Sequence, residues 1–280
     1  PAINERYANF WSEREDMRPL EALEPDRCKS VRAVFSDIDD TMTTGGKLPA
    51  AAYEAMWRLQ EAEIPFVPIT GRPAGWCDLI ARQWPIDGVI GENGALAYFE
   101  SGGKLERIYH PETISDAQER LGVIREAVLA EVEGSRVSKD QFCRLFDLAI
   151  DFCEEPPDLG LEGAEAIRAI FARFGAEAKV SSIHVNGWFG NYNKLSMAEI
   201  YASERWGESL SDAPGSYLFC GDSPNDEPMF AFFPLSCGVA NVHEFSSEMQ
   251  SLPTFIAERE GGEGFAQIID TFLKHREGGG

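Results

Sequence analysis

Two patterns of apolar residues alternate along most of this chain. Short apolar runs at 31–37, 64–69 and 88–91 are typical of buried strands, and the segments 50–63 and 74–84 between them carry apolar residues at helical spacing. This order of strands and helices predicts a parallel, doubly wound sheet. Before it, the spacing predicts an amphipathic helix over the first two dozen residues. The apolar face of this helix would be formed by Tyr7, Phe10, Trp11, Met17 and Leu20.

The pattern changes in the middle of the chain. The predicted elements there are a hairpin over 95–109, a helix over 115–133, a strand over 145–152, a helix over 161–174 and a long strand over 178–188. Largely antiparallel strands with helices on one side predict an inserted α+β domain, which we place at 96–188. The core would then consist of residues 1–95 and 189–280.

After the insertion the chain returns to its first rhythm. The predicted elements are a helix over 194–206, a strand over 216–221, a short helix after Pro224, strands at 236–239 and 254–257, and a final helix over 264–275. The sequence therefore predicts an α/β protein, in which a doubly wound parallel-sheet core carries one inserted α+β domain.

The composition argues against several classes of partner. With 280 residues and an apolar fraction of 44%, the chain is long enough for a large core. A formal charge of −22, a pI near 4.5 and no basic cluster argue against nucleic acid or an anionic membrane as partner. The six cysteines form no CxxC pair and are typical of buried residues in a reducing compartment. Without a signal-peptide pattern or an apolar run of about 18 residues, we expect a cytoplasmic protein.

Two carboxylates mark the end of the first predicted strand. Asp37 and Asp39 lie in the sequence Asp37-Ile38-Asp39-Asp40-Thr41, directly after an apolar run. Because side chains alternate along a strand, Asp37 and Asp39 share one face. Carboxylates this close repel each other, so either a cation neutralises them or one holds a proton. Acidic turns also solvate the ends of ordinary strands, so the pair alone does not establish a site.

Two further strand ends supply the partners that such a pair needs. Thr70-Gly71-Arg72 follows the second strand, and Gly221-Asp222-Ser223-Pro224-Asn225-Asp226 follows the strand at 216–221. In an open parallel sheet the carboxyl ends of neighbouring strands face one crevice. Mg²⁺ prefers carboxylate and phosphate oxygens, and Asp37 and Asp222 fit that need.

Together these residues resemble the haloacid dehalogenase superfamily of phosphotransferases. Residues 37–41 are similar to its first motif, residues 70–72 to its second, Lys194 to its third and residues 221–226 to its fourth, in the family's order. The insertion before Lys194 resembles a C2-type cap. The likeness is greatest to the Cof-type, sucrose-phosphatase-like and mannosyl-3-phosphoglycerate-phosphatase-like members of subfamily IIB, and it extends from about residue 31 to 272.

The resemblance implies a mechanism. Asp37 would be the nucleophile that forms an aspartyl-phosphate, and Asp39 would act as general acid and then general base. Mg²⁺ would be bound by Asp37, by the main-chain carbonyl of Asp39 and by Asp222. Thr70 and Lys194 would hold the phosphoryl oxygens. The residues implied to lie behind the metal and orient its surroundings are Asn225 and Asp226.

Several positions beside these motifs allow more than one interpretation. The family often has Gly after the second Asp, whereas this chain has Asp40, whose side chain we expect to point to solvent. Arg72 either binds substrate or pairs with a carboxylate of the sheet. Glu92 and Asn93 are interpreted as a turn rather than a substrate contact.

The cap sheet should roof the site, so its strands are expected to recognise the leaving group. Our candidates are Arg144, His184, Asn186 and Trp188. His184 and Asn186 share a face with Trp188, which can stack on a sugar ring while the other two bind hydroxyls. His184 and Trp188 are equally consistent with buried packing residues of the cap.

The leading hypothesis is a Mg²⁺-dependent phosphatase for a small phosphate ester, with a sugar phosphate such as a sucrose, trehalose or mannosylglycerate phosphate as substrate. A phosphomutase is an alternative, if the aspartyl-phosphate survives until an acceptor hydroxyl arrives. A third hypothesis is a sensor of phosphorylated ligands without activity. Such a sensor would be expected to have lost one of Asp37, Asp39, Lys194 or Asp222, and all four are present.

Overall fold

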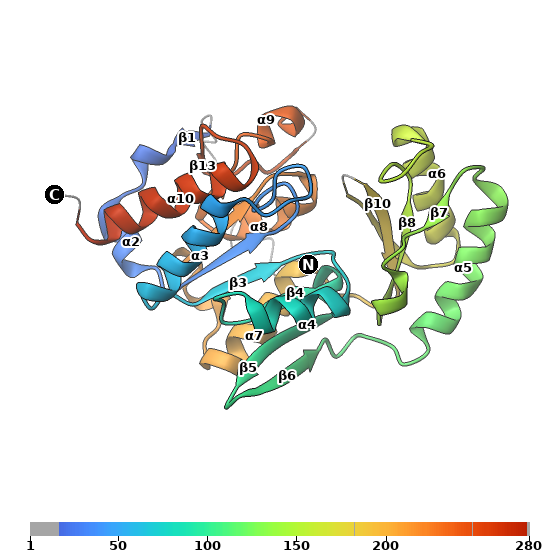
Figure 1. Cartoon of the computed structure of the whole chain (residues 1–280), viewed down its shortest axis with the longest axis horizontal. Coiled ribbons are helices and arrows are strands. Elements are labelled where there is room, and N and C mark those ends of the chain that lie inside the picture. The colour runs from blue at the N-terminus through green and yellow to red at the C-terminus, as the bar shows by residue number, and fades with distance from the viewer. Residues whose placement is uncertain (1–16, 182, 248, 279–280) are drawn as a thin grey trace.

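The computed structural model describes residues 17–181, 183–247 and 249–278. Its largest element is a nine-stranded sheet in the order β1-β13-β12-β11-β2-β3-β4-β5-β6 (Figure 1). The strands from β1 to β4 in this order are parallel, and β5 and β6 extend the sheet in antiparallel fashion. The strands are β1 (Arg18–Pro19), β2 (Ala33–Asp37), β3 (Phe66–Ile69), β4 (Val89–Gly91), β5 (Leu96–Ser101), β6 (Lys104–Tyr109), β11 (Tyr217–Gly221), β12 (Leu235–Gly238) and β13 (Phe255–Ile256).

Helices cover both faces of this sheet. Successive residues of a strand point to opposite sides, and where both sets are apolar, each face needs helices to bury it. In β2, Val34 packs into one apolar cluster together with α2, α3, α4 and α10, whereas Phe35 packs into another with α7 and α8. The predicted doubly wound core is therefore confirmed. The helices are α2 (Pro25–Ser30), α3 (Ala50–Glu61), α4 (Ala74–Gln83), α7 (Lys194–Trp206), α8 (Glu227–Phe232), α9 (Val242–Phe245) and α10 (Gly261–Arg276).

A second, antiparallel sheet in the order β7-β8-β10-β9 lies beside the large one (Figure 1). One of its faces packs on α5 and α6 through residues such as Ile150 and Val185. His184 and Asn186 alternate with Val185 along β10 and point to the other face. The expected α+β insertion is thus present. Its elements are α5 (Ala117–Glu131), β7 (Arg136–Val137), β8 (Asp147–Asp151), α6 (Gly160–Arg173), β9 (Glu177–Val180) and β10 (His184–Trp188).

The predicted start of the insertion at residue 96 is wrong in one respect, because the hairpin of β5 and β6 belongs to the large sheet. A 3₁₀ turn at Glu92–Gly94 reverses the chain directly after β4, with Glu92 and Asn93 in the left-handed region at φ of 46° and 56°. β5 then runs back along β4 and pairs Ala97 with Ile90. The alternation of apolar residues predicts a hairpin but not the sheet that it extends.

Two other predicted elements differ from the structure. The long strand over 178–188 is an antiparallel pair, because the Ser181 hydroxyl accepts the His184 N–H at 3.0 Å and closes a turn between β9 and β10. The predicted N-terminal helix lies largely outside the described residues, and where the description begins, Arg18–Pro19 forms a strand that pairs with β13.

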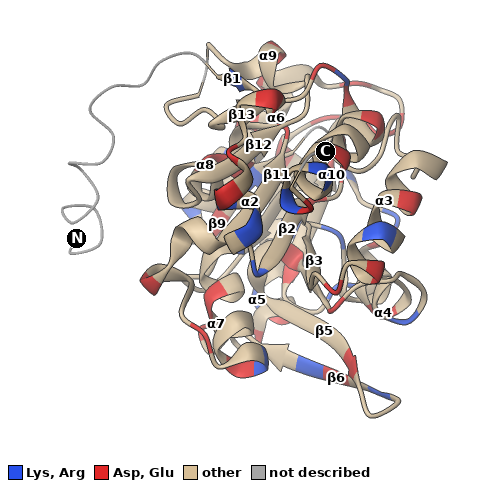
Figure 2. Cartoon of the chain, turned by 90° about the vertical axis from the view of Figure 1, so that its left-hand side faces the viewer, with Lys and Arg blue, Asp and Glu red and all other residues tan. Residues whose placement is uncertain are grey.

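The surface agrees with the acidic composition. On the face shown in Figure 2, Lys and Arg form short separate segments among Asp and Glu. Within the described ranges, no helix combines the length and the apolar content that crossing a membrane requires.

Candidate active site

The candidate active site lies where three adjacent strands of the large sheet end. β11, β2 and β3 are neighbours, and the register places Asp37 opposite Ile69, directly before Thr70. Asp222 follows the last residue of β11, and Lys194 is the first residue of α7. The structure therefore gathers residues from four distant parts of the sequence at one edge of the sheet, as a parallel sheet allows.

Lys194 joins two buried carboxylates. Its ammonium lies 2.5 Å from Asp37 Oδ1 and 2.8 Å from Asp226 Oδ1. Asn193 fixes the start of α7 by capping it, since its side chain accepts the backbone N–H of Ser196 at 2.9 Å. Burial would lower the pKa of Lys194, but Asp226 and Asp37 outweigh burial and raise it, so the ammonium stays charged.

Three carboxylates at this site can hold a metal ion. Oxygens of Asp37, Asp222 and Asp226 lie within 4.8 Å of one another. The Asp226 oxygens accept hydrogen bonds from Lys194 and from the backbone N–H of Asp222, at 2.8 and 3.1 Å. Asp37 and Asp222 each have only one oxygen in a hydrogen bond described here, to Lys194 and Thr41. This donor set suits a hard divalent cation between Asp37 and Asp222, with Asp226 behind them.

The electrostatics of the cluster favour a cation. Burial raises the pKa of Asp37 well above its usual range, and the Asp226, Asp222 and Asp39 charges add to the effect that Lys194 opposes. Burial and then Asp226 likewise raise the pKa of Asp222. Buried carboxylates of this kind must either be protonated or be neutralised by a bound positive charge.

Asp39 is held by the second motif. Arg72 donates to both oxygens of Asp39, at 2.8 to 3.1 Å, and its guanidinium stacks over Trp76 with 4.5 Å to the ring centroid. The Thr70 hydroxyl donates to Asp39 at 3.3 Å and accepts the Arg72 N–H at 3.0 Å. Of the two interpretations of Arg72, the structure thus shows the pairing with a carboxylate.

Asp40 and Thr41 take positions that sequence reasoning did not foresee. Asp40 was expected to face solvent, but it is half-buried and lines the cavity, where its charge adds to the rise in the pKa of Asp222. Its φ of 59° explains why Gly suits this position, and Asp tolerates this conformation better than most residues. The Thr41 hydroxyl donates a hydrogen bond to Asp222 at 3.0 Å. Its position in the first motif is the sequence feature that could have predicted this contact.

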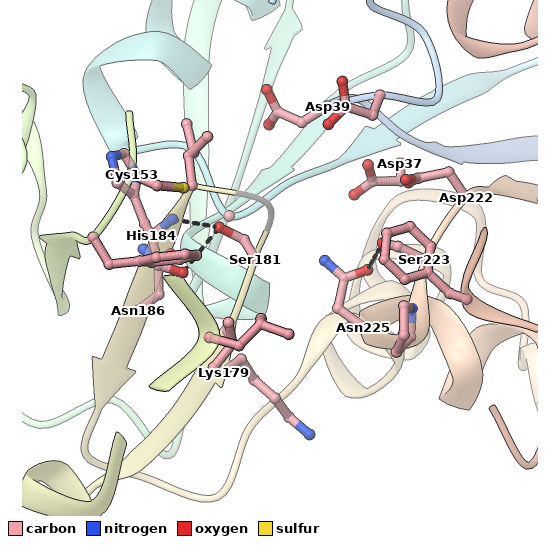
Figure 3. Close-up of a pocket in the computed structure, with 18 of the residues that line it drawn as sticks. Asp37, Asp39, Cys153, Lys179, Ser181, His184, Asn186, Asp222, Ser223 and Asn225 are labelled. Atoms are coloured by element: carbon pink, nitrogen blue, oxygen red, sulfur yellow. Dashed lines mark hydrogen bonds between the residues drawn. The ribbon is translucent and has the colours of Figure 1, made fainter. Parts of the chain in front are cut away.

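Asn225 does not contact Lys194 in the hydrogen bonds described. Its side-chain oxygen accepts the Ser223 hydroxyl at 2.9 Å, and its side chain lines the cavity beside Asp222 (Figure 3). Of the two residues predicted to orient the site, Asp226 alone has the contacts with Lys194 and Asp222 that the prediction requires.

A cavity of about 830 Å³ separates this edge from the second sheet. Figure 3 shows His184, Asn186, Ser181 and Lys179 on the cap side, across from Asp37 and Asp222.

The four cap candidates have different surroundings. His184 contacts Glu154 at 2.8 Å, and burial lowers its pKa despite that carboxylate. Asn186 donates to Asp147 at 3.0 Å. Arg144 lines the cavity but is paired with acidic residues of the cap.

Trp188 does not contribute to the cavity wall described here. It is buried against Tyr192, whose ring stacks on it with centroids 5.7 Å apart. The burial of Trp188 therefore argues against the expected stacking on a sugar and favours its interpretation as a packing residue. Trp188 is buried because it lies at the end of β10, where the strand returns to the core.

Comparisons with known proteins find a hydrolase family and phosphatases among the similar sequences. Residues 34–121 match the model of the haloacid dehalogenase-like hydrolase family. A phosphoglycolate phosphatase from Methanospirillum hungatei is 25% identical over 254 residues, covering 88% of this chain and 98% of the relative. A phosphoglycolate phosphatase from Halorubrum lacusprofundi is 26% identical over 242 residues, covering 84% and 96%.

Solved structures share the fold at lower identity. Thermoplasma acidophilum 0175 superposes with a TM-score of 0.65 at 17% identity, over 87% of this chain and 98% of that one. The C-terminal domain of the C. albicans trehalose-6-phosphate phosphatase gives a TM-score of 0.69 at 14% identity, over 94% and 99%. The family match over residues 34–121, the phosphatase relatives and the fold shared with the solved structures together support a phosphatase similar to the haloacid dehalogenase-like hydrolases.

Proposed function

We propose that the protein is a Mg²⁺-dependent phosphatase that hydrolyses a small phosphate ester through an aspartyl-phosphate on Asp37. The observation that supports this most directly is the placement of Asp37. One of its oxygens contacts Lys194, and one oxygen each of Asp37, Asp222 and Asp226 lie within 4.8 Å of one another. Asp37 and Asp222 would hold the metal, which would offset the charge of the phosphoryl group.

In the first step, Asp37 attacks the phosphorus atom, and the bond between phosphorus and the leaving oxygen breaks. Asp39 gives its proton to that oxygen, so the alcohol leaves neutral. Lys194 and the Thr70 hydroxyl stabilise the negative charge on the phosphoryl oxygens. Arg72 lies against Asp39 and can share its guanidinium between that carboxylate and the phosphoryl group.

In the second step, Asp39 takes a proton from a water molecule, and the resulting hydroxide attacks the phosphorus. The bond between phosphorus and Asp37 breaks, which releases inorganic phosphate and restores the Asp37 carboxylate. Asp39 is suited to both steps because its side chain is 33% exposed, which gives it access to the cavity and to water.

For the substrate we propose a sugar phosphate with a leaving group of disaccharide size. A cavity of about 830 Å³ is of the size that encloses ligands larger than a two-carbon acid. His184, Asn186 and Ser181 give its cap wall hydrogen-bonding groups suited to hydroxyls. A small phosphorylated acid is the second candidate, because the relatives at 25 and 26% identity are named phosphoglycolate phosphatases.

A panel of phosphate esters, assayed for free phosphate with and without Mg²⁺, tests the proposal. We expect Mg²⁺-dependent release, fastest from disaccharide phosphates. Faster release from phosphoglycolate would support the second candidate. An isomeric sugar phosphate with little free phosphate would indicate a mutase, and no release from any ester would favour the sensor.

A further inference from the structure

A buried polar bridge connects the phosphoryl site to the cap. It consists of Glu92, at the end of β4, and Arg144, which precedes β8. Their exposed fractions are 0% and 5%. Glu92 directly follows β4 of the large sheet, whereas Arg144 precedes β8 of the second sheet.

Glu92 accepts backbone N–H groups from both sides of the bridge. Its Oε1 accepts from Ala74, at the start of α4, at 2.9 Å and from Leu145 at 2.8 Å, and its Oε2 accepts from Phe146 at 2.7 Å. One carboxylate thus ties a core helix to the cap segment that enters β8.

This arrangement is costly to maintain. Glu92 has a φ of 46°, which is uncommon for a residue with a long side chain. Burial and then the charge of Asp147 raise the pKa of Glu92 to about 7. We therefore expect the buried Glu92 carboxylate to have a role that an apolar side chain cannot have, because apolar packing provides no directional hydrogen bonds.

Arg144 forms the second half of the bridge. Its Nη1 donates to the carbonyl oxygen of Gly71 at 2.9 Å, between Thr70 and Arg72 of the phosphoryl site. The same nitrogen contacts Asp147 at 2.8 Å, and Asp147 accepts Asn186 Nδ2 at 3.0 Å. A continuous series of hydrogen bonds therefore runs from the second motif to the cavity wall of the cap.

We propose that Glu92 and Arg144 are positioning residues that hold the leaving-group wall of the cap at a fixed distance from the phosphoryl site. They act through the backbone and through Asn186, and Glu92 is not among the described residues that line the cavity. The inference rests on the proposed function, because it assigns the bridge to substrates whose leaving group reaches the cap.

The test compares two substrates in the Glu92→Gln variant. Gln keeps the size of Glu but turns one acceptor into a donor that faces an N–H group, so the contact with Leu145 or Phe146 is lost. For the best sugar phosphate of the panel, we expect kcat/KM to fall about 10-fold or more, mainly through KM. Acetyl phosphate, whose leaving group is too small to reach the cap wall, should be hydrolysed within about 2-fold of the wild-type rate.

Controls separate positioning from folding. Glu100→Gln, an exposed Glu at the end of β5, should leave both rates unchanged. Arg144→Lys, which keeps the charge but loses the branched geometry, should show the same substrate dependence as Glu92→Gln. Equal losses for both substrates would overturn the proposal, as would unchanged rates for both.

Hydrogen exchange provides a readout that does not depend on activity. In Glu92→Gln, at least one of the amides of Leu145 and Phe146 should exchange about 10-fold faster, while those of α5 and α6 keep their wild-type rates. Unchanged exchange at Leu145 and Phe146 would overturn the proposal even if no ester in the panel is hydrolysed. Failure of the wild-type protein on acetyl phosphate and on every ester would instead contradict the proposed function.

Discussion

Replacing Lys194 by Met tests the electrostatic design of the active site. Met keeps much of the volume of the buried stem but removes the ammonium that lies 2.5 Å from Asp37 and 2.8 Å from Asp226. Removing one partner of a buried ion pair costs about 3–5 kcal/mol. Proton uptake by the remaining carboxylates will reduce this loss of stability, because burial already raises the pKa of Asp37. We therefore expect a fall in Tm of roughly 5–15 °C without metal.

The effect on catalysis should be larger than the effect on folding. Lys194 would contact phosphoryl oxygens whose charge increases in the transition state, and losing one such donor costs about 10²- to 10³-fold in kcat. The assay is phosphate release at saturating Mg²⁺, at a temperature well below the Tm of the variant. Lys104→Met, at an exposed position of the hairpin, is the matched control. A Lys194→Met variant that keeps more than about a tenth of the wild-type kcat would refute this account of Lys194.

Three further predictions follow from the same site. Asp37→Asn should leave the fold intact and reduce turnover to below about 1% of wild type in a phosphate-release assay, whereas Asp212→Asn, at an exposed position, should not. Burial raises the pKa of Asp37 and Asp222, so these groups destabilise the metal-free protein as pH rises above about 4. We therefore expect Mg²⁺ at 100 times its Kd to raise Tm by roughly 5–10 °C at pH 8. An equally large rise at pH 5 with the same Mg²⁺ concentration would contradict this reasoning. Asp40→Gly removes a negative charge beside Asp222, and Gly suits the φ of 59° at this position. Calorimetry should therefore show that Mg²⁺ binds about 2- to 10-fold more weakly, while the Tm stays nearly unchanged. Tighter Mg²⁺ binding would contradict this role of Asp40.

The sequence predicts the strand ends well because their signals are local. The apolar run before Asp37 and the one before Asp222 each specify a buried strand that ends in acidic residues, and parallel strands bring such ends together. The local pattern predicts only that a helix starts at Lys194, and the place of Lys194 in the site came from the resemblance to a family motif. The predicted positions of these residues within the fold therefore agree with the structure, whereas their catalytic roles stay predictions.

The surroundings of individual side chains were harder to predict, because they depend on contacts that carry no local pattern. Trp188 alternates correctly along its strand, yet the exit of the strand toward the core buries it against Tyr192. Arg144 was a candidate for recognising the leaving group, but its guanidinium is paired with acidic residues of the cap. Asp40 lines the cavity and has a φ of 59°, which its residue type did not predict.

Within the part of the chain that the structure describes, the two outer strands of the large sheet restrict how copies of this protein can assemble. One border is β1, a strand of two residues that ends in Pro19, which has no N–H to offer. The other is β6, where Lys104, Glu106 and Arg107 are exposed. Charged or proline-containing borders discourage a neighbouring chain from adding a strand, so an oligomer of this protein should be built from its helices or its cap.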